Sequence, residues 1–239
     1  MRRARFGDLD VVLAGGTDRE GGGDGPLVVL LHGFGAPGED LVPLHRVLRV
    51  PRGTRFAFPA APIELDMMPG LDSRAWWNID MFRLQSAMER GELRDLSTEV
   101  PEGLDEARAK LDAALDAMRA ELRPSALVVG GFSQGSMLAV DTALRFPDAF
   151  DAVVILSGTL LARDVWVPRM PTLAGKPVFQ SHGSHDPILP LALATELQRE
   201  LARAGAKVTF VPFRGGHEIP APVLDALSTF FEAVLRKDA

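Results

Sequence analysis

The amino-acid sequence predicts an α/β protein with a mainly parallel central sheet and helices on both faces. Short apolar runs rich in Val, Ile and Phe alternate along the chain with longer segments of helical period. Several of these runs are apolar at nearly every position, which is expected of parallel strands that are covered on both faces. The expected strands are residues 6–13, 27–32, 54–58, 126–130, 152–156, 177–181 and 207–211.

Helices are expected between these strands. The clearest covers residues 104–122, where apolar side chains recur at helical spacing along one face. Residues 136–145, 189–204 and 223–236 are expected to form further helices. A glycine-rich stretch, residues 15–25, reads as a flexible hairpin turn between two strands. Because neither an internal repeat nor an interdomain linker is found, residues 1–239 are interpreted as a single domain.

The composition excludes several classes of protein. Hydrophobic residues make up 46% and charged residues 24% of the chain, which is typical of a globular protein that buries a sizeable core. The chain has no cysteine, which excludes disulfides, thiolate zinc sites and a cysteine nucleophile. A formal net charge of −6 argues against a nucleic-acid partner, which would favour a basic surface.

Secretion and stable membrane insertion are not expected. The basic residues near the N-terminus are followed by Asp8 and Asp10, which interrupt the sequence where the apolar core of a signal peptide would have to lie. The longest apolar run, residues 27–31, is too short to cross a bilayer. A cytoplasmic location is therefore expected.

A serine motif stands at the junction of an expected strand and an expected helix. The segment Gly131-Phe132-Ser133-Gln134-Gly135 matches G-x-S-x-G in the strand–turn–helix context that the α/β-hydrolase fold uses for its nucleophile. The serine must occupy a sharp, strained turn, and side chains at the two glycines would collide with the neighbouring strand and helix. We therefore predict the α/β-hydrolase fold with Ser133 as nucleophile; the alternative is a glycine-rich turn without chemistry.

The acid and the base are expected further along the chain. A serine hydroxyl needs a base to take its proton and a third group to orient that base, and in this fold the order is Ser, Asp or Glu, His. Asp186 and His217 each lie in a loop that follows an expected strand. Asp164 lies before the expected loop and Asp225 lies after the base, so both are weaker candidates for the acid. The predicted catalytic residues are Ser133, Asp186 and His217.

The remaining histidines have other expected roles. His32 precedes the nucleophile, which is the wrong order for the base, and His45 lies in an expected surface helix. His182 and His185 flank Asp186 and could be read as metal ligands, but a functional metal would need further ligands in suitable geometry. His182 is expected instead to end a strand and to form a hydrogen bond within the loop. No metal and no cofactor is expected.

An oxyanion hole is predicted from two backbone amides. Residues 31–35, Leu-His-Gly-Phe-Gly, close an expected strand with a glycine-rich loop that leaves a backbone N–H accessible to a substrate carbonyl. The N–H of Phe34 is paired with that of Gln134, which follows the nucleophile directly. The alternative is a simple turn at the end of a strand.

Five segments together resemble the phospholipase/carboxylesterase family, which includes acyl-protein thioesterases and small bacterial carboxylesterases. The similar segments are Leu31-His32-Gly33-Phe34-Gly35, Ser73-Arg74-Ala75-Trp76-Trp77, Gly131-Phe132-Ser133-Gln134-Gly135, Asp186 with Pro190, and Gly216-His217-Glu218-Ile219. The resemblance extends across nearly the whole chain. It implies a compact hydrolase of carboxylic esters or thioesters without a separate cap domain.

Four positions depart from the family pattern. Ser136 stands where members commonly carry glycine, and Ser184 replaces an acidic residue two positions before the catalytic Asp. Trp77 and Asn78 stand where members commonly have Phe-Asp. These departures leave the triad intact and bear on the identity of the substrate.

An acyl pocket is expected from the long connection over residues 59–88. Its apolar and methionine side chains suit an acyl chain, and a connection of this length in a compact domain is often functional. The candidate substrate-binding residues are Trp77, Trp76, Met68 and Leu71, and the alternative for each is ordinary core packing. Residues 63–82 are predicted to favour short to medium acyl chains.

The predicted function is hydrolysis of a small-molecule ester or thioester through a Ser-His-Asp triad and an acyl-enzyme intermediate. A non-catalytic ligand-binding protein of the same fold is the alternative from another class. Within the enzymes, an acyl-protein thioesterase or lysophospholipase-type activity is the alternative. Whether the protein forms a homodimer is left open by the sequence.

Overall fold

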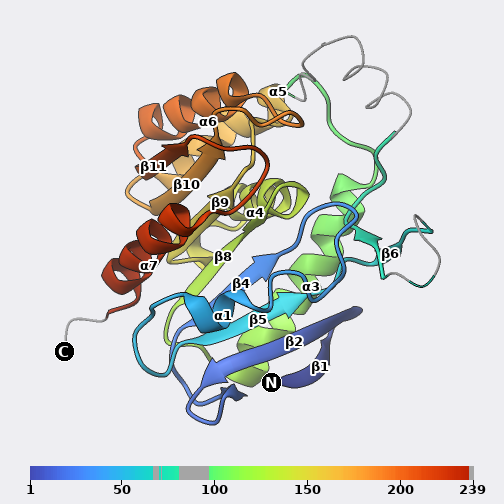
Figure 1. The fold of residues 1–239 in the computed structure, drawn as a ribbon, viewed down its shortest axis with the longest axis vertical. Helices are drawn as coiled ribbons and strands as arrows, with labels where there is room; N and C mark the ends of the chain where they lie inside the picture. The colour runs from blue at the N-terminus through green and yellow to red at the C-terminus, as the bar shows by residue number, and fades with distance from the viewer. Residues whose placement is uncertain (67–69, 71, 81–96, 237–239) are drawn as a thin grey trace.

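The central sheet places its strands in the order β1-β2-β5-β4-β8-β9-β10-β11, and β3 pairs with β2 (Figure 1). The structure is a computed structural model that describes residues 1–66, 70, 72–80 and 97–236. Strand pairs from β5 to β11 are parallel, whereas β1–β2 and β2–β5 are antiparallel. The strands are β1 (Arg2–Phe6), β2 (Leu9–Gly16), β3 (Glu20–Gly22), β4 (Leu27–Leu31), β5 (Arg55–Pro59), β8 (Leu127–Phe132), β9 (Ala152–Leu156), β10 (Pro177–Gly183) and β11 (Lys207–Phe213), and a separate small sheet pairs β6 (Ile63–Glu64) with β7 (Arg74–Ala75).

Helices cover both faces of the sheet. The helices are α1 (Leu44–Val47), α3 (Leu104–Leu122), α4 (Gln134–Arg145), α5 (Arg163–Trp166), α6 (Leu191–Arg203) and α7 (Ala221–Leu235), with 3₁₀ turns at Pro147–Ala149 and Val167–Leu173. In β4, Val29 packs in the core that α3, α4 and α6 cover, whereas Val28 packs in the core that α7 covers. Alternate residues of a strand thus enter two separate cores, which is why the parallel strands are apolar throughout. The predicted fold class is confirmed.

One expected strand is wrong in its extent. The run over residues 6–13 is broken after Phe6, because Gly7 has a φ of +54° and turns the chain back on itself. The result is a β1–β2 hairpin in which Phe6 lies opposite Leu9. Periodicity did not reveal this turn, since a single glycine can also occur inside a strand. The prediction of one domain without a cap stays a prediction, since residues 67–69, 71 and 81–96 lie outside the described residues.

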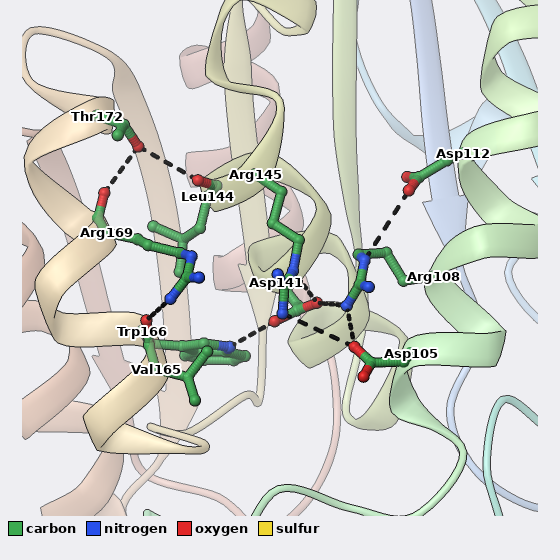
Figure 2. A network of polar contacts seen from close by, with 10 residues as sticks. All are labelled: Asp105, Arg108, Asp112, Asp141, Leu144, Arg145, Val165, Trp166, Arg169 and Thr172. Carbon is green, nitrogen blue, oxygen red and sulfur yellow. Dashed lines mark hydrogen bonds and ion pairs between the residues drawn. The ribbon is translucent and has the colours of Figure 1, made fainter.

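A buried carboxylate joins the helices on one face of the sheet. Asp141 of α4 is 1% exposed and accepts hydrogen bonds from Arg108 of α3 (2.9 Å), Arg145 (3.2 Å) and the indole N–H of Trp166 (2.9 Å), as Figure 2 shows. A buried carboxylate is stable only when it is paired and hydrogen-bonded, and Asp141 has both kinds of partner. At the edge of this network, Asp112 lies 4.0 Å from Arg108.

We expect Asp112→Asn to stabilise the protein at neutral pH. Burial raises the pKa of Asp112 from 3.8 to about 6, and its Oδ1 has no hydrogen-bond partner among the described residues. A carboxyl with a raised pKa in the folded state favours folding at low pH, and this contribution is lost as the pH rises from about 4 through 6. Since the side chain is 22% exposed, the charge costs about 1–2 kcal/mol at pH 7 rather than the full value of the shift.

Denaturant unfolding of wild type and variant between pH 4 and 8 measures this effect. The stability difference should be largest at pH 7–8 and should shrink toward pH 4. Asp116→Asn is the matched control, because Asp116 lies one turn further along α3 with its side chain 78% exposed. The control should change stability by less than about 0.5 kcal/mol. An equal gain in both variants would argue against a burial effect at Asp112.

Candidate active site

Ser133 occupies a strained turn between β8 and α4. Its φ of +53° and ψ of −121° are rare for a residue with a side chain, and α4 begins at the next residue. The N–H of Ser133 donates to the carbonyl of Leu156 at the end of β9 (2.9 Å), and its own carbonyl accepts from Ser136 and Met137 in the first turn of α4. These bonds hold the turn in place against the strain.

The two glycines of the motif are required by close backbone contacts. A Cβ at Gly131 would lie 2.5 Å from the carbonyl oxygen of Leu31 and 2.6 Å from the carbonyl carbon of Gly135. A Cβ at Gly135 would lie 2.2 Å from the oxygen of Leu31 and 2.5 Å from that of His32. Both distances to Leu31 are far below van der Waals contact. The predicted collisions with the neighbouring strand and helix are therefore confirmed.

Asp186 follows β10 and is held by backbone amides. Its Oδ1 accepts hydrogen bonds from the N–H groups of Ile188 (2.8 Å) and Leu189 (2.9 Å), and its Oδ2 lies 2.6 Å from Nδ1 of His217. Burial raises the pKa of the Asp186 carboxyl, but the hydrogen bonds from His217 and Leu189 outweigh it, so the pKa lies below its ordinary value. Asp186 is consequently ionised at neutral pH and accepts a proton-bearing imidazole nitrogen.

His217 follows β11 and contacts both Asp186 and Phe132, the residue directly before Ser133. Because Asp186 is an acceptor, the 2.6 Å contact places the ring proton on Nδ1 and leaves Nε2 with a free lone pair. The ring centroid of His217 lies 4.7 Å from that of Phe132, the residue directly before Ser133. The tertiary structure thus brings together three segments that are distant in the sequence.

The loops that carry Asp186 and His217 meet at a glycine. A Cβ at Gly183 would lie 2.1 Å from the carbonyl oxygen of Gly216 and 2.6 Å from that of Gly215. The same loops are joined by hydrogen bonds from Ser184 N–H to Phe213 and from His185 N–H to Gly215. The short Asp186–His217 contact depends on this close approach.

We expect Gly183→Ala to lower kcat/KM by about 10²-fold. The added methyl group should push the loop of His217 away from that of Asp186, and a displacement of about 1 Å in a catalytic group costs activity of this order. Gly216→Ala is the matched control, because a Cβ at Gly216 meets only Pro187 at 4.0 Å and Gly216 does not have a positive φ. Steady-state assays of both variants, with thermal melting to confirm folding, measure the difference. Equal activities of the two variants would contradict the steric argument.

The predicted oxyanion amides belong to two segments that meet at Ser133, the loop after β4 and the start of α4. A Cβ at Gly33 would lie 3.3 Å from the Cβ of Ser133, so the loop after β4 runs beside the serine. The N–H of Phe34 has no backbone acceptor among the residues that the structure describes. Gln134 is the first residue of α4, where an N–H has no acceptor within its own helix and forms part of the positive end of the helix dipole. The role of these two N–H groups as oxyanion donors stays a prediction.

His182 and His185 turn toward partners within the loop. Nε2 of His182 lies 2.9 Å from the carbonyl of Leu189, which confirms the expected hydrogen bond at the end of the strand. It also lies 3.5 Å from Oδ2 of Asp186, a contact that the sequence did not indicate. His185 is paired with the hydroxyl of Ser184 (3.0 Å). Over the described ranges, no group of three or more His, Cys, Asp or Glu side chains converges on one point.

Two of the four acyl-pocket candidates lie in the described part of the chain. Trp76 and Trp77 are 1% and 3% exposed, and both border a cavity of about 740 Å³. The indole N–H of Trp76 is bonded to the carbonyl of His32 (3.0 Å), so this side chain braces a loop, a role that the sequence did not indicate. Met68 and Leu71 lie outside the described residues. Contact of Trp77 or Trp76 with a substrate stays a prediction.

None of the described helices combines the length and the apolar composition that crossing a bilayer requires.

Comparison with known proteins identifies the family of the chain. Residues 21–235 match the family model described as Phospholipase/Carboxylesterase. The chain is 29% identical over 222 residues to an acyl-protein thioesterase 1 of Eremothecium gossypii, with 87% of each chain covered. It is 27% identical over 215 residues to a probable carboxylesterase of Oryza sativa subsp. japonica, covering 87% of this chain and 77% of the relative.

The fold is also found in solved structures. The structure of esterase PE8 superposes with a TM-score of 0.77 at 27% identity, covering 95% of this chain and 99% of the other. The resemblance drawn from the sequence motifs is thereby confirmed, and the alternative of a non-catalytic binding protein is not supported. The chain belongs to the phospholipase/carboxylesterase family and is a hydrolase of carboxylic esters or thioesters.

Proposed function

We propose that Ser133, His217 and Asp186 are the catalytic triad of this hydrolase and that it works through an acyl-enzyme intermediate. The observation that carries the proposal is the 2.6 Å contact between His217 and Asp186, beside a serine in a strained turn with φ of +53°. This contact sets the tautomer of His217, with the ring proton on Nδ1. The arrangement suits a base whose Nε2 must be free of its proton.

In the first step, Nε2 of His217 takes the hydroxyl proton of Ser133 while the oxygen attacks the substrate carbonyl. The N–H groups of Phe34 and Gln134 stabilise the oxyanion of the tetrahedral intermediate. His217 then returns the proton to the departing alcohol or thiol, and the acyl group stays on Ser133. Water, activated by the same imidazole, hydrolyses the acyl-enzyme and restores the serine.

Covalent labelling tests the nucleophile. A fluorophosphonate should modify the protein once, and peptide mass mapping should locate the adduct on Ser133. An adduct on a different serine would overturn the assignment.

We further propose that the preferred substrates carry short to medium acyl chains. The support is the apolar content of residues 63–82. A panel of matched oxygen esters and thioesters, from acetyl to palmitoyl, gives kcat/KM against chain length. The maximum should lie at short or medium chains, whereas a maximum at palmitoyl or a preference for charged acyl groups would contradict the proposal. The panel also shows whether oxygen or sulfur esters are preferred.

A further inference from the structure

The side chain of Gln134 forms two hydrogen bonds that have no part in the reaction scheme above. Its Oε1 accepts from the backbone N–H of Trp76 (2.9 Å), and its Nε2 donates to the carbonyl of Trp77 (2.8 Å). The residue is 1% exposed. The orientation of the amide is determined by its partners, because an N–H must face the oxygen and a carbonyl must face the nitrogen. Gln134 therefore binds residues 74–77, hereafter the strap, to the start of α4.

The strap is also bonded to residues 32–36, hereafter the oxyanion loop. The N–H of Gly35 donates to the carbonyl of Arg74 (2.8 Å), and the N–H of Arg74 donates to the carbonyl of Ala36 (3.1 Å). The indole N–H of Trp76 donates to the carbonyl of His32 (3.0 Å). These bonds lie on both sides of Phe34, whose amide is one of the two proposed oxyanion donors.

The His32 ring fixes the start of the same loop. Its Nε2 accepts from the N–H of Ala61 (3.0 Å), so the ring proton is on Nδ1, which lies 2.8 Å from the carbonyl of Gly33. Burial lowers the pKa of His32, which keeps the ring neutral and able to accept this bond. The oxyanion loop is thus held by polar contacts along its length.

We propose that the Gln134 side chain is a positioning residue that sets the two oxyanion amides relative to each other through the strap. One amide belongs to Gln134 itself, and the other belongs to a loop that the strap holds by three hydrogen bonds. Oxyanion stabilisation depends on donors that are already in place when the charge develops. Loss of the clamp should therefore weaken binding of the transition state more than binding of the substrate. This inference rests on the proposed function.

Gln134→Met tests the proposal, because it keeps the size of the side chain and removes both hydrogen bonds. We expect kcat to fall by about 10- to 100-fold, less than or similar to the loss of a complete oxyanion donor, with KM within about twofold of wild type. The inhibition constant of an alkylboronic acid, whose adduct with Ser133 resembles the tetrahedral intermediate, should rise in parallel with the loss of kcat.

Gln180→Met is the matched control. Gln180 is also fully buried, and its Nε2 donates to a backbone carbonyl, that of Ala194 (2.7 Å), but this bond has no connection to the strap. The control should lose thermal stability while it retains kcat and inhibitor affinity. If Gln134→Met keeps kcat within twofold of wild type, or if both variants lose kcat equally, the positioning role is overturned.

Trp76→Phe is a second variant that acts on the strap from the other side. It removes the indole bond to His32, leaves the backbone bond of residue 76 to Gln134 in place, and should also lower kcat with little change in KM. The double variant should lose less than the product of the two single losses, because both changes act through the same segment. If Gln134→Met does not fold, Trp76→Phe carries the test, and an unchanged kcat overturns the proposal. Ser133→Ala tests the proposed function separately: full activity of that variant would refute the triad, whereas full activity of Gln134→Met alone refutes only the clamp.

Discussion

Replacement of Ser133 by alanine should reduce ester hydrolysis by about 10⁵-fold or more. The reason is that no acyl-enzyme can form without the hydroxyl, and the oxyanion amides and His217 then have no attacking group to assist. The free energy of unfolding should change little, because the backbone strain at a φ of +53° is the same for alanine and for serine. The measurement is the hydrolysis of a p-nitrophenyl ester, with circular dichroism melting to confirm the fold.

Ser184→Ala is the control for this experiment. Ser184 is exposed, lies two positions before Asp186 and bonds only the neighbouring His185 ring through its hydroxyl. Its loss should change kcat/KM by no more than about threefold, since it removes one exposed hydrogen bond. Wild-type activity in Ser133→Ala would exclude Ser133 as the nucleophile. A large loss in Ser184→Ala would show that activity depends on any change in the loop that carries Asp186.

Replacement of Asp186 by asparagine should lower kcat by about 10⁴-fold, with KM nearly unchanged. Oδ1 of Asp186 accepts two backbone N–H bonds, from Ile188 and Leu189. The asparagine oxygen should therefore occupy this position, which turns the amide NH₂ toward His217. The NH₂ group then requires a lone pair on Nδ1, so the ring proton moves to Nε2 and the imidazole can no longer act as base.

Asp164→Asn is the matched control, because Asp164 is an exposed carboxylate in α5 that also lies between Ser133 and His217 in the sequence. It should retain wild-type activity. The pH profile adds a second check, since the residual activity of Asp186→Asn should rise at alkaline pH as hydroxide replaces the missing base. Wild-type kcat in Asp186→Asn would refute the role of this carboxylate.

The sequence predicted those features that depend on local spacing. Alternation of strands and helices indicated the fold class, because a strand that is covered on both faces must be apolar at successive positions. The strand–glycine–serine–glycine–helix pattern indicated the nucleophile, because only glycines tolerate the contacts at 131 and 135 that the structure shows. The prediction of one strand over residues 6–13 was wrong because it also relied on local pattern. That pattern does not show whether the chain stays extended at Gly7 or turns back there.

What the sequence alone determined is the fold class, the family and the identity of the candidate serine, acid and base. Only the tertiary structure decided how these groups meet: that His217 bonds to Asp186, that Gly183 must lack a side chain for this contact, and that Trp76 braces the oxyanion loop. The physical reason is that hydrogen bonds between distant segments depend on where the sheet places the ends of its strands. The spacing of residues along the chain does not give the positions of the strand ends in space. It therefore indicates which residues are candidate partners, but not which of them are in contact.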